Sequence, residues 1–90
     1  MAKRGKLEIT RDILNIIKEN RNLIKTTPLL RKSALSSTRF KEYYLYLLDR
    51  SLIKEVSADN DEKHIILTEK GFEFLEKYKT IINFIGEFDL

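Results

Sequence analysis

Hydroxyl-bearing and basic side chains come together at one place in the first half of the sequence, over residues 36–42. The stretch 36–38 offers three hydroxyls, and as the start of a helix it also offers free backbone N–H groups, which together suit a phosphate. Arg39 near a helix start opposes the helix dipole at a cost of about a few tenths of a kcal/mol or more. A basic residue there therefore favours contact with a phosphate or a base edge over a purely structural role. The candidate contact residues of this segment are Ser36, Ser37, Thr38, Arg39, Lys41 and Glu42.

Other residues could extend or modify such a contact. Arg31 and Lys32 precede the segment and would reach phosphates, or they are simply solvated. Lys63, and with it Lys54, could touch a nucleic-acid backbone from a later part of the chain. Glu42 could accept a hydrogen bond from a cytosine amine, or it is solvated or ion-paired.

Catalytic and metal chemistry find little support in the sequence. The single histidine, His64, has no cysteine to join it at a metal site and no evident catalytic base beside it. The acids Asp59, Asp61 and Glu62 lack the glycine and the distal glutamate of a calcium-binding loop. The three glycines form no phosphate-cradling motif. We therefore expect a protein that is not an enzyme and that needs no cofactor or metal.

The charge is divided unevenly along the chain. Residues 1–50 carry 12 Lys or Arg and 5 Asp or Glu, a net charge of +7, whereas residues 51–90 carry 5 Lys or Arg and 9 Asp or Glu, a net −4. A basic half beside an acidic half predicts one face for a polyanion and another for a different contact. Scattered solvated charge is the alternative interpretation.

Length and composition are typical of one small globular domain. The chain has 90 residues, of which 42% are hydrophobic and 34% charged. Its apolar runs, such as residues 65–67, are too short to span a bilayer, and the basic start leads into no apolar signal region. There is no cysteine, so a disulfide framework is excluded. We expect a cytoplasmic protein.

Apolar periodicity predicts three helices in the first half. Ile9, Ile13, Ile16 and Ile17 recur at helical spacing, which predicts a helix over about residues 7–20. The pair 23–24 suggests a single strand pairing. Thr27 as N-cap and Pro28 at the first helical position predict a second helix over 28–33. After a turn at 34–36, Ser36 caps a third helix over about 37–50, with Phe40, Tyr43, Tyr44 and Leu47 on its core-facing side.

The pattern then changes to that of a β-hairpin and a last helix. Residues 53–58 alternate in polarity, 59–62 have turn chemistry, and 64–67 form the returning strand. Thr68 caps a helix running to about Gly86. We predict a mainly α fold with a β-hairpin, in the order helix, short strand, helix, helix, strand, strand, helix. Its parts are a basic N-terminal tail (1–6, with Lys3, Arg4 and Lys6 disordered or acting as an arm), a winged helix-turn-helix domain (7–67) and a C-terminal dimerisation helix (68–90).

A short helix, a three-residue turn and a longer helix form a helix-turn-helix unit, whose second helix can enter the major groove of DNA. Residues 35–53 resemble the recognition-helix segment of winged-helix regulators. The segment begins with Leu-Ser, and its end is similar to the pattern Leu-x-x-x-Gly-Leu-Ile. Residues 66–71, Ile-Leu-Thr-Glu-Lys-Gly, resemble their strand-to-helix signature, Leu-Thr-x-x-Gly. The chain is most similar to small archaeal winged-helix proteins of the chromatin-type and predicted transcriptional-regulator groups. It is more distantly similar to the multiple-antibiotic-resistance regulators. The resemblance implies DNA binding and a dimer formed through the C-terminal helix.

Two departures from this family pattern matter. Ser51 stands where glycine is usual, which leaves the helix end less free. The hairpin tip, residues 59–63, is mostly acidic, although family wings often carry Arg or Lys towards the minor groove. Because phosphates repel an acidic tip, we expect that this wing does not insert.

The last helix carries a separate signal. Phe74, Tyr78, Ile81, Ile85 and Phe88 are spaced 4, 3, 4 and 3 apart, which is a heptad seam of the coiled-coil kind. One small domain covers only part of such a face, so the remainder predicts a homodimer about a two-fold axis. The alternative is that the helix folds fully onto its own domain. The predicted interface residues are Phe74, Tyr78, Ile81, Ile82, Ile85 and Phe88.

Two hypotheses for function follow. The first is a dimeric double-stranded DNA-binding protein, either a transcriptional regulator or a nucleoid-associated protein. The second is a winged-helix module that binds a protein of the transcription machinery, supported by the acidic hairpin and by Leu45, Tyr46 and Leu48. RNA binding is a weaker third, because no platform of stacked aromatic residues is evident.

Overall fold

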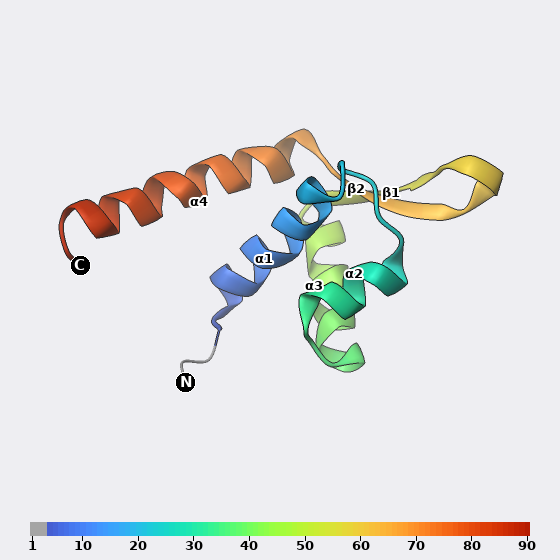
Figure 1. Ribbon diagram of the computed structural model, residues 1–90, viewed down its shortest axis with the longest axis horizontal. Helices are drawn as coiled ribbons and strands as arrows, with labels where there is room; N and C mark the ends of the chain where they lie inside the picture. Colours follow the sequence, from blue (N-terminus) through green and yellow to red (C-terminus); the bar gives the residue numbers. More distant parts are fainter. Residues whose placement is uncertain (1–3) are drawn as a thin grey trace.

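The computed structural model describes residues 4–90 and has the predicted order of elements (Figure 1). Lys3, which we assigned to a basic tail, lies outside the described residues. The isolated strand pairing is also present, since Ile24 bridges Ile65 through two backbone hydrogen bonds of 2.7 and 3.1 Å. The elements are α1 (Lys6–Glu19), α2 (Thr26–Ser33), α3 (Ser37–Asp49), β1 (Ile53–Ser57), a short 3₁₀ turn (Asp59–Asp61), β2 (Lys63–Leu67) and α4 (Glu69–Glu87).

The predicted caps of α3 and α4 are confirmed. The Ser36 hydroxyl accepts a hydrogen bond from the backbone N–H of Arg39 at 3.2 Å. The Thr68 hydroxyl accepts one from the N–H of Gly71 at 3.0 Å. Each satisfies a backbone donor that the first turn of a helix leaves unpaired.

The predicted start of α2 is wrong. The helix begins at Thr26 with Lys25 at the N-cap, so Thr27 is not the cap and Pro28 occupies the third helical position. The first intrahelical hydrogen bond runs from the N–H of Leu29 to the carbonyl of Lys25 at 3.2 Å. Because an N–H group at any of the first three helical positions has no intrahelical acceptor, proline, which lacks an N–H, is tolerated at the third position as well as at the first.

Residues 4–6, which we assigned to a basic tail, are held to the domain. Lys6 is already the first residue of α1. The Arg4 guanidinium bonds the carboxylate of Asp12 at 2.9 Å and the carbonyl of Ser33 at 3.0 Å. Arg4 therefore links α1 to the end of α2 instead of lying free as an arm.

The wing is the antiparallel pair β1–β2, in register from Ile53 opposite Leu67 to Ser57 opposite Lys63. Its tip turns through Asn60 and Asp61, with φ of 62° and 57°, a conformation that Asn and Asp tolerate better than most residues. The side-chain oxygen of Asn22 accepts a hydrogen bond from the N–H of Leu67 at 2.7 Å and so caps the inner end of β2.

One apolar core joins these elements. α1 contributes four fully buried residues, α3 contributes three residues of its predicted core-facing side, and the wing contributes the inner residues of both strands. Tyr43, the fourth residue of that side, is half-buried at the edge of the core. The core residues are Ile9, Ile13, Leu14, Ile17, Ile24, Leu29, Phe40, Tyr44, Leu47, Leu52, Ile53, Ile65 and Leu67.

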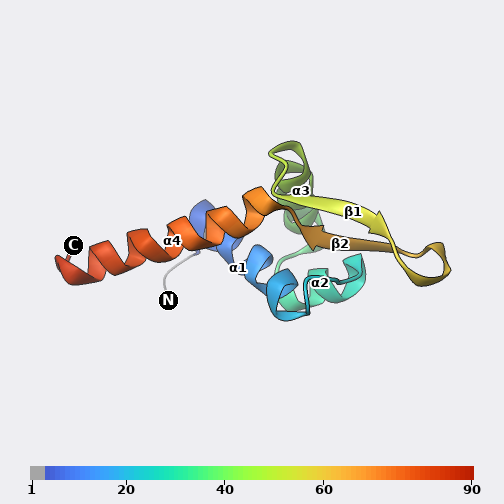
Figure 2. The same ribbon diagram turned by 90° about the horizontal axis from the view of Figure 1, so that it is seen from above.

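The molecule is elongated, with principal extents of 49 × 28 × 22 Å. The wing projects from one end of the long axis and α4 from the other (Figures 1 and 2). The first half of α4 packs near α1, where Phe74 and Leu75 contact the core, and residues 79–90 are all exposed. Over residues 4–90, no helix is long and apolar enough to cross a lipid bilayer.

Candidate nucleic-acid interface

The turn between α2 and α3 sets the geometry of the candidate site. Ala34 adopts a left-handed conformation with φ of 59° and ends α2. The buried Ser33 hydroxyl donates to the carbonyl of Leu30 at 2.6 Å and accepts from the N–H of Leu35 at 3.3 Å. With Arg4 bonded to the Ser33 carbonyl, these contacts hold the two helices in a fixed relation.

The start of α3 presents the predicted contact residues to solvent. Ser36, Ser37, Thr38, Arg39, Lys41 and Glu42 are all exposed. The N–H groups of Ser37 and Thr38 belong to the first turn and have no acceptor within the helix. Among the residues that the structure describes, Arg39 and Lys41 form no ion pair. Hydroxyls and free donors therefore gather at the start of α3, with the uncompensated cations Arg39 and Lys41 on different sides of the helix, because residues two apart do not face each other.

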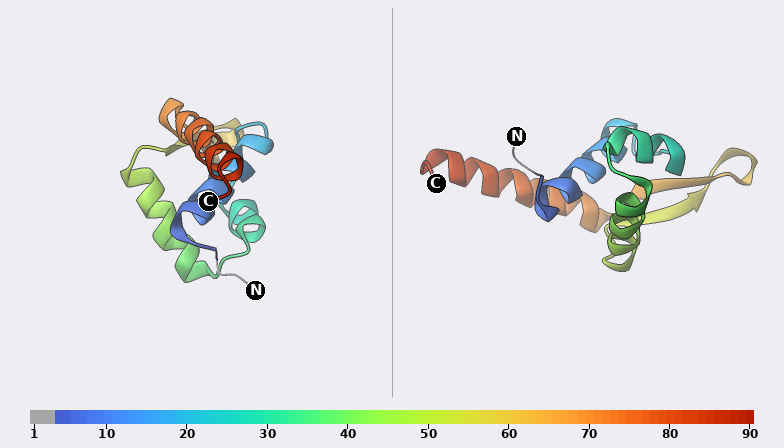
Figure 3. Two further views of the ribbon diagram at one scale, coloured as in Figure 1. Left: turned by 90° about the vertical axis from the view of Figure 1, so that its left-hand side faces the viewer. Right: turned by 90° about the horizontal axis from the view of Figure 1, so that it is seen from below.

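A hollow of about 350 Å³ flanks this surface between the beginning of α1 and α3. Arg39 and Glu42 line it from α3, and Lys6 lines it from α1. The Lys6 ammonium lies 4.2 Å from the centre of the Tyr46 ring, and the guanidinium of Arg50 lies 5.2 Å from the same ring. Viewed along α4, the beginning of α1 lies between α3 and α2 (Figure 3). No sequence pattern indicated the proximity of Lys6 to α3, because it depends on packing between distant segments.

The basic residues of α2 are also exposed. Arg31 has no ion pair among the described residues. The Lys32 ammonium donates a hydrogen bond to the side-chain oxygen of Asn20 at 3.3 Å, a neutral partner that leaves its charge intact. Both side chains remain available to an anion.

Two cations near the wing, Lys63 and Lys25, are already paired with carboxylates. Lys63, a predicted contact residue, pairs with Glu55 at 3.3 Å. Glu55 also accepts a hydrogen bond from the Tyr44 hydroxyl, and this bond, with Lys63, holds the pKa of Glu55 below its usual value. Nearer the tip, Lys25 bonds Glu62 and lowers the pKa of that carboxyl. Of the two lysines on the wing strands, Lys63 is therefore paired, whereas Lys54 is exposed and forms no ion pair among the described residues.

The seam of α4 divides into two parts. Phe74 and Tyr78 are half-buried against their own domain. Farther along, Ile81, Ile85 and Phe88 are 48%, 38% and 58% exposed. Ile82 and Phe84 are exposed beside them, so the outer half of the helix carries an uncovered apolar face.

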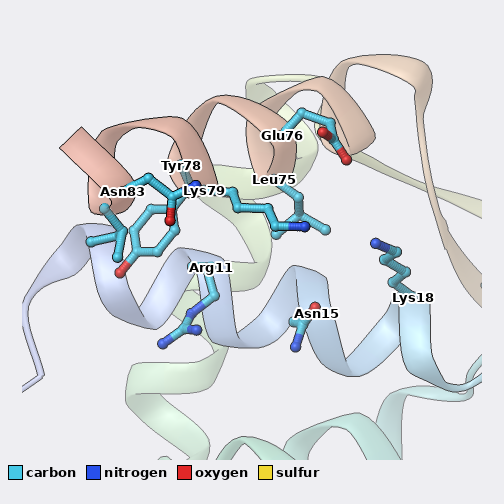
Figure 4. Close-up of a pocket in the computed structure, with 9 residues that line it drawn as sticks. Arg11, Asn15, Lys18, Leu75, Glu76, Tyr78, Lys79 and Asn83 are labelled. Atoms are coloured by element: carbon cyan, nitrogen blue, oxygen red, sulfur yellow. The ribbon is translucent and has the colours of Figure 1, made fainter. Parts of the chain in front are cut away.

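A second hollow, of about 280 Å³, lies between α1 and α4 (Figure 4). Arg11 and Lys18 line it from α1, and Lys79 and Glu76 line it from α4. The Arg11 guanidinium lies 5.2 Å from the centre of the Tyr78 ring, which fixes α4 against α1. Arg11 was not singled out in the sequence, and its contact is structural.

Two helices joined by a tight turn, an exposed basic second helix and a following β-hairpin define a winged helix-turn-helix domain. The chain matches the family model described as winged helix-turn-helix over residues 3–86, and it belongs to this family. A search of curated proteins found no significant match.

Solved structures of the same fold include DNA-binding proteins from different sources. Sso10a-2, a DNA-binding protein from Sulfolobus solfataricus, has a TM-score of 0.73 at 21% identity, covering 94% of this chain and 85% of that one. F93 from STIV, a winged-helix DNA-binding protein, has a TM-score of 0.72 at 21% identity, covering 89% and 91%. A MarR family transcriptional regulator from Silicibacter pomeroyi DSS has a TM-score of 0.73 at 18% identity over 90% of this chain. The chain spans only 55% of the length of that regulator.

Proposed function

We propose that the protein is a non-enzymatic double-stranded DNA-binding protein that acts as a homodimer, in transcription regulation or as a nucleoid-associated protein. One observation carries the proposal. The second helix of a helix-turn-helix unit begins with exposed Arg39 and Lys41, whose charges no described carboxylate neutralises. Such a surface fits the phosphates and base edges of a major groove.

In this proposal α3 enters the major groove with its N-terminal turn foremost. Ser37 and Thr38 offer hydroxyl and backbone donors to a phosphate. Lys41 and Glu42, one turn farther on, are placed to meet base edges. Arg31 and Lys32 of α2 contact the backbone beside the groove. Lys63 contributes little, because Glu55 already neutralises it.

The dimer is proposed from the outer half of α4. Its apolar residues, including Ile81, Ile85 and Phe88, form an exposed face on a helix that projects from the domain. Large contiguous apolar surface is uncommon on monomers and marks an interaction site. A second copy supplies a complementary seam, because the same residues recur on it about a two-fold axis.

The test is a fluorescence anisotropy titration of a labelled duplex at several salt concentrations. Wild-type protein is expected to bind at low salt and to weaken steeply as salt rises, because counterions are released from the phosphates. Arg39→Ala with Lys41→Ala should weaken binding by about a hundredfold at low salt, on the scale of hydrogen bonds to charged groups.

The matched control is Lys70→Ala with Lys79→Ala, which removes the same charge from exposed positions of α4. Equal losses of DNA affinity in the two double variants would show that binding depends on net charge alone and not on the start of α3. Failure of wild type to bind duplex at low salt, with one protein recovered in affinity purification, would favour the interaction-module hypothesis.

A further inference from the structure

We propose that the hollow between the first turn of α1 and α3 is the seat of one DNA backbone phosphate, held between Lys6 and Arg39. This inference rests on the proposed DNA binding and specifies it. It adds a contact from α1, on the flank of α3 away from the wing, and it assigns Arg39 to the backbone instead of to a base.

The hollow has the charge and size for a phosphate group. Its volume is about 350 Å³, and its charged lining consists of Lys6, Arg39 and one acid, Glu42, a net charge of +1. No described carboxylate pairs with either cation. Tyr43 and Tyr46 form the rest of the lining, so the two cations border a space walled by aromatic rings.

A contact with an aromatic ring favours a position of the Lys6 ammonium beside the hollow in the absence of any ligand. Its ammonium lies 4.2 Å from the Tyr46 ring centre, within the range of a cation–π interaction. Its backbone lies in the first turn of α1, where the first intrahelical bond runs from the N–H of Ile9 to the carbonyl of Gly5. The N–H groups of the first turn therefore have no intrahelical acceptor, and the carboxylate of Glu8 in the same turn offsets part of their positive potential.

The two flanks of α3 differ in charge, and this difference points to the α1 side. On the wing flank, Glu55 accepts a hydrogen bond from the Tyr44 hydroxyl and forms an ion pair with the Lys63 ammonium. On the α1 flank, Lys6 and Arg39 have no described carboxylate partner. A helix lying in a groove has a phosphate backbone on each side of it, and the two cations that line the hollow on the α1 flank are unpaired, whereas Lys63 on the wing flank is paired.

Arg39 consequently acts with Lys6 on one phosphate, and base discrimination falls to residues farther from the hollow, such as Lys41. Removing either cation should weaken binding to all duplex sequences by a similar factor, which distinguishes a backbone contact from a base contact.

The experiment measures binding of one labelled duplex of arbitrary sequence at several salt concentrations. Lys6→Gln should weaken binding by about tenfold at low salt and lower the slope of log affinity against log salt by about one. Lys6→Arg should bind as wild type. Lys18→Gln, which removes the same charge near the other end of α1, should change affinity by less than about twofold, because a distant exposed charge is screened.

A double-variant cycle tests whether the two cations share a phosphate. The combined Lys6→Gln and Arg39→Gln variant should lose less affinity than the product of the two single effects, because the second substitution finds the contact already lost. Thermal melts check that each variant folds. If Lys6→Gln melts early, Lys6→Met keeps the apolar stem over Tyr46 and removes only the charge.

Three outcomes would overturn the inference while the proposed function survives: wild-type affinity in Lys6→Gln, equal losses in Lys6→Gln and Lys18→Gln, or fully multiplicative effects in the double variant. If wild-type protein binds no duplex at all, the proposed function itself fails. The titration of wild-type protein alone gives this result, so the two failures are distinguishable.

Discussion

The hydroxyl of Tyr44, on the second helix of the helix-turn-helix unit, donates a hydrogen bond to the carboxylate of Glu55 on the first strand of the wing. The Tyr44 ring is buried in the core and stacks with Phe40 at a centroid distance of 5.8 Å. The bond therefore joins a rigidly packed residue of α3 to the core-facing side of β1, two residues beyond the buried Ile53, and it fixes the wing relative to the helix proposed to enter DNA.

Tyr44→Phe should loosen this connection without opening a cavity. The variant keeps the buried ring and removes one hydrogen bond to a charged group, which should lower the free energy of unfolding by about 0.5–1.5 kcal/mol, since Glu55 is partly solvated. Urea denaturation measures the loss. Tyr43→Phe is the matched control, because Tyr43 is half-buried beside Tyr44 on the same helix. Equal losses in the two variants would show that the Tyr44–Glu55 bond has no special weight.

Acid sensitivity should also depend on Glu55. The hydrogen bond from Tyr44 lowers the folded-state pKa of Glu55 below its usual 4.5, so its contribution to stability is present above that value and is lost as pH falls through the lowered pKa. Thermal melts below about pH 5 should therefore show a smaller drop in melting temperature for Glu55→Gln than for wild type. Glu42→Gln, on the exposed side of α3, serves as the comparison and should retain the wild-type acid profile. A parallel acid profile for Glu55→Gln and wild type would contradict this assignment.

The elements of the fold were predictable where their causes are local. Ser36 and Thr68 were identified as caps because a hydroxyl at the N-cap acts on an N–H group three residues away. The hairpin followed from alternating polarity and from Asp and Asn at its tip. The start of α2 was wrong because Pro28 is compatible with several positions of the first turn, and its presence alone does not select one.

The parts of the candidate site that escaped prediction depend on contacts between distant segments. Lys63 was expected to be available to DNA, but the register of the hairpin places it near Glu55. Lys6 and Arg4 were assigned to a tail, yet packing of α1 brings Lys6 over Tyr46 and Arg4 to Ser33. No periodicity or spacing in the chain encodes these pairs.

Ser51→Gly should stabilise the protein. Ser51 follows α3 with φ of 60°, and left-handed backbone costs an L-residue about 1–2 kcal/mol. Glycine removes this cost but adds about 0.5–1 kcal/mol of conformational entropy to the unfolded chain, so the net gain should be about 0.5–1 kcal/mol. Chemical denaturation of both proteins measures the difference. Ser57→Gly, at an extended position of β1, should lower stability, and a gain there would undermine the explanation.

Gly71→Ala should be strongly destabilising. A Cβ built on Gly71 would lie 2.3 Å from the carbonyl oxygen of Leu52, so α4 would have to move away from the end of the core. That carbonyl also accepts the N–H of Thr68 at 3.1 Å, and overpacking at such a site costs about 1–3 kcal/mol. Gly86→Ala is the matched control, since no atom lies within 4 Å of its Cβ position, and alanine should favour the helix by up to about 1 kcal/mol. Thermal melts of the two variants should shift in opposite directions.

The two copies of α4 in the proposed dimer should run antiparallel, crossing near Ile81. Phe74 and Phe88 each lie seven residues from Ile81, so an antiparallel pair that crosses there places the exposed Phe88 of one copy over the half-buried Phe74 of the other. A residue on a two-fold axis contacts its own counterpart, so Ile81→Cys should form an inter-copy disulfide on mild oxidation. The chain has no native cysteine, which keeps the product unambiguous on a non-reducing gel.

Phe74→Cys and Phe88→Cys should each form little disulfide alone and should cross-link when mixed. Efficient self-cross-linking of Phe88→Cys would instead indicate parallel helices, and a concentration-independent monomer in sedimentation would remove the dimer altogether.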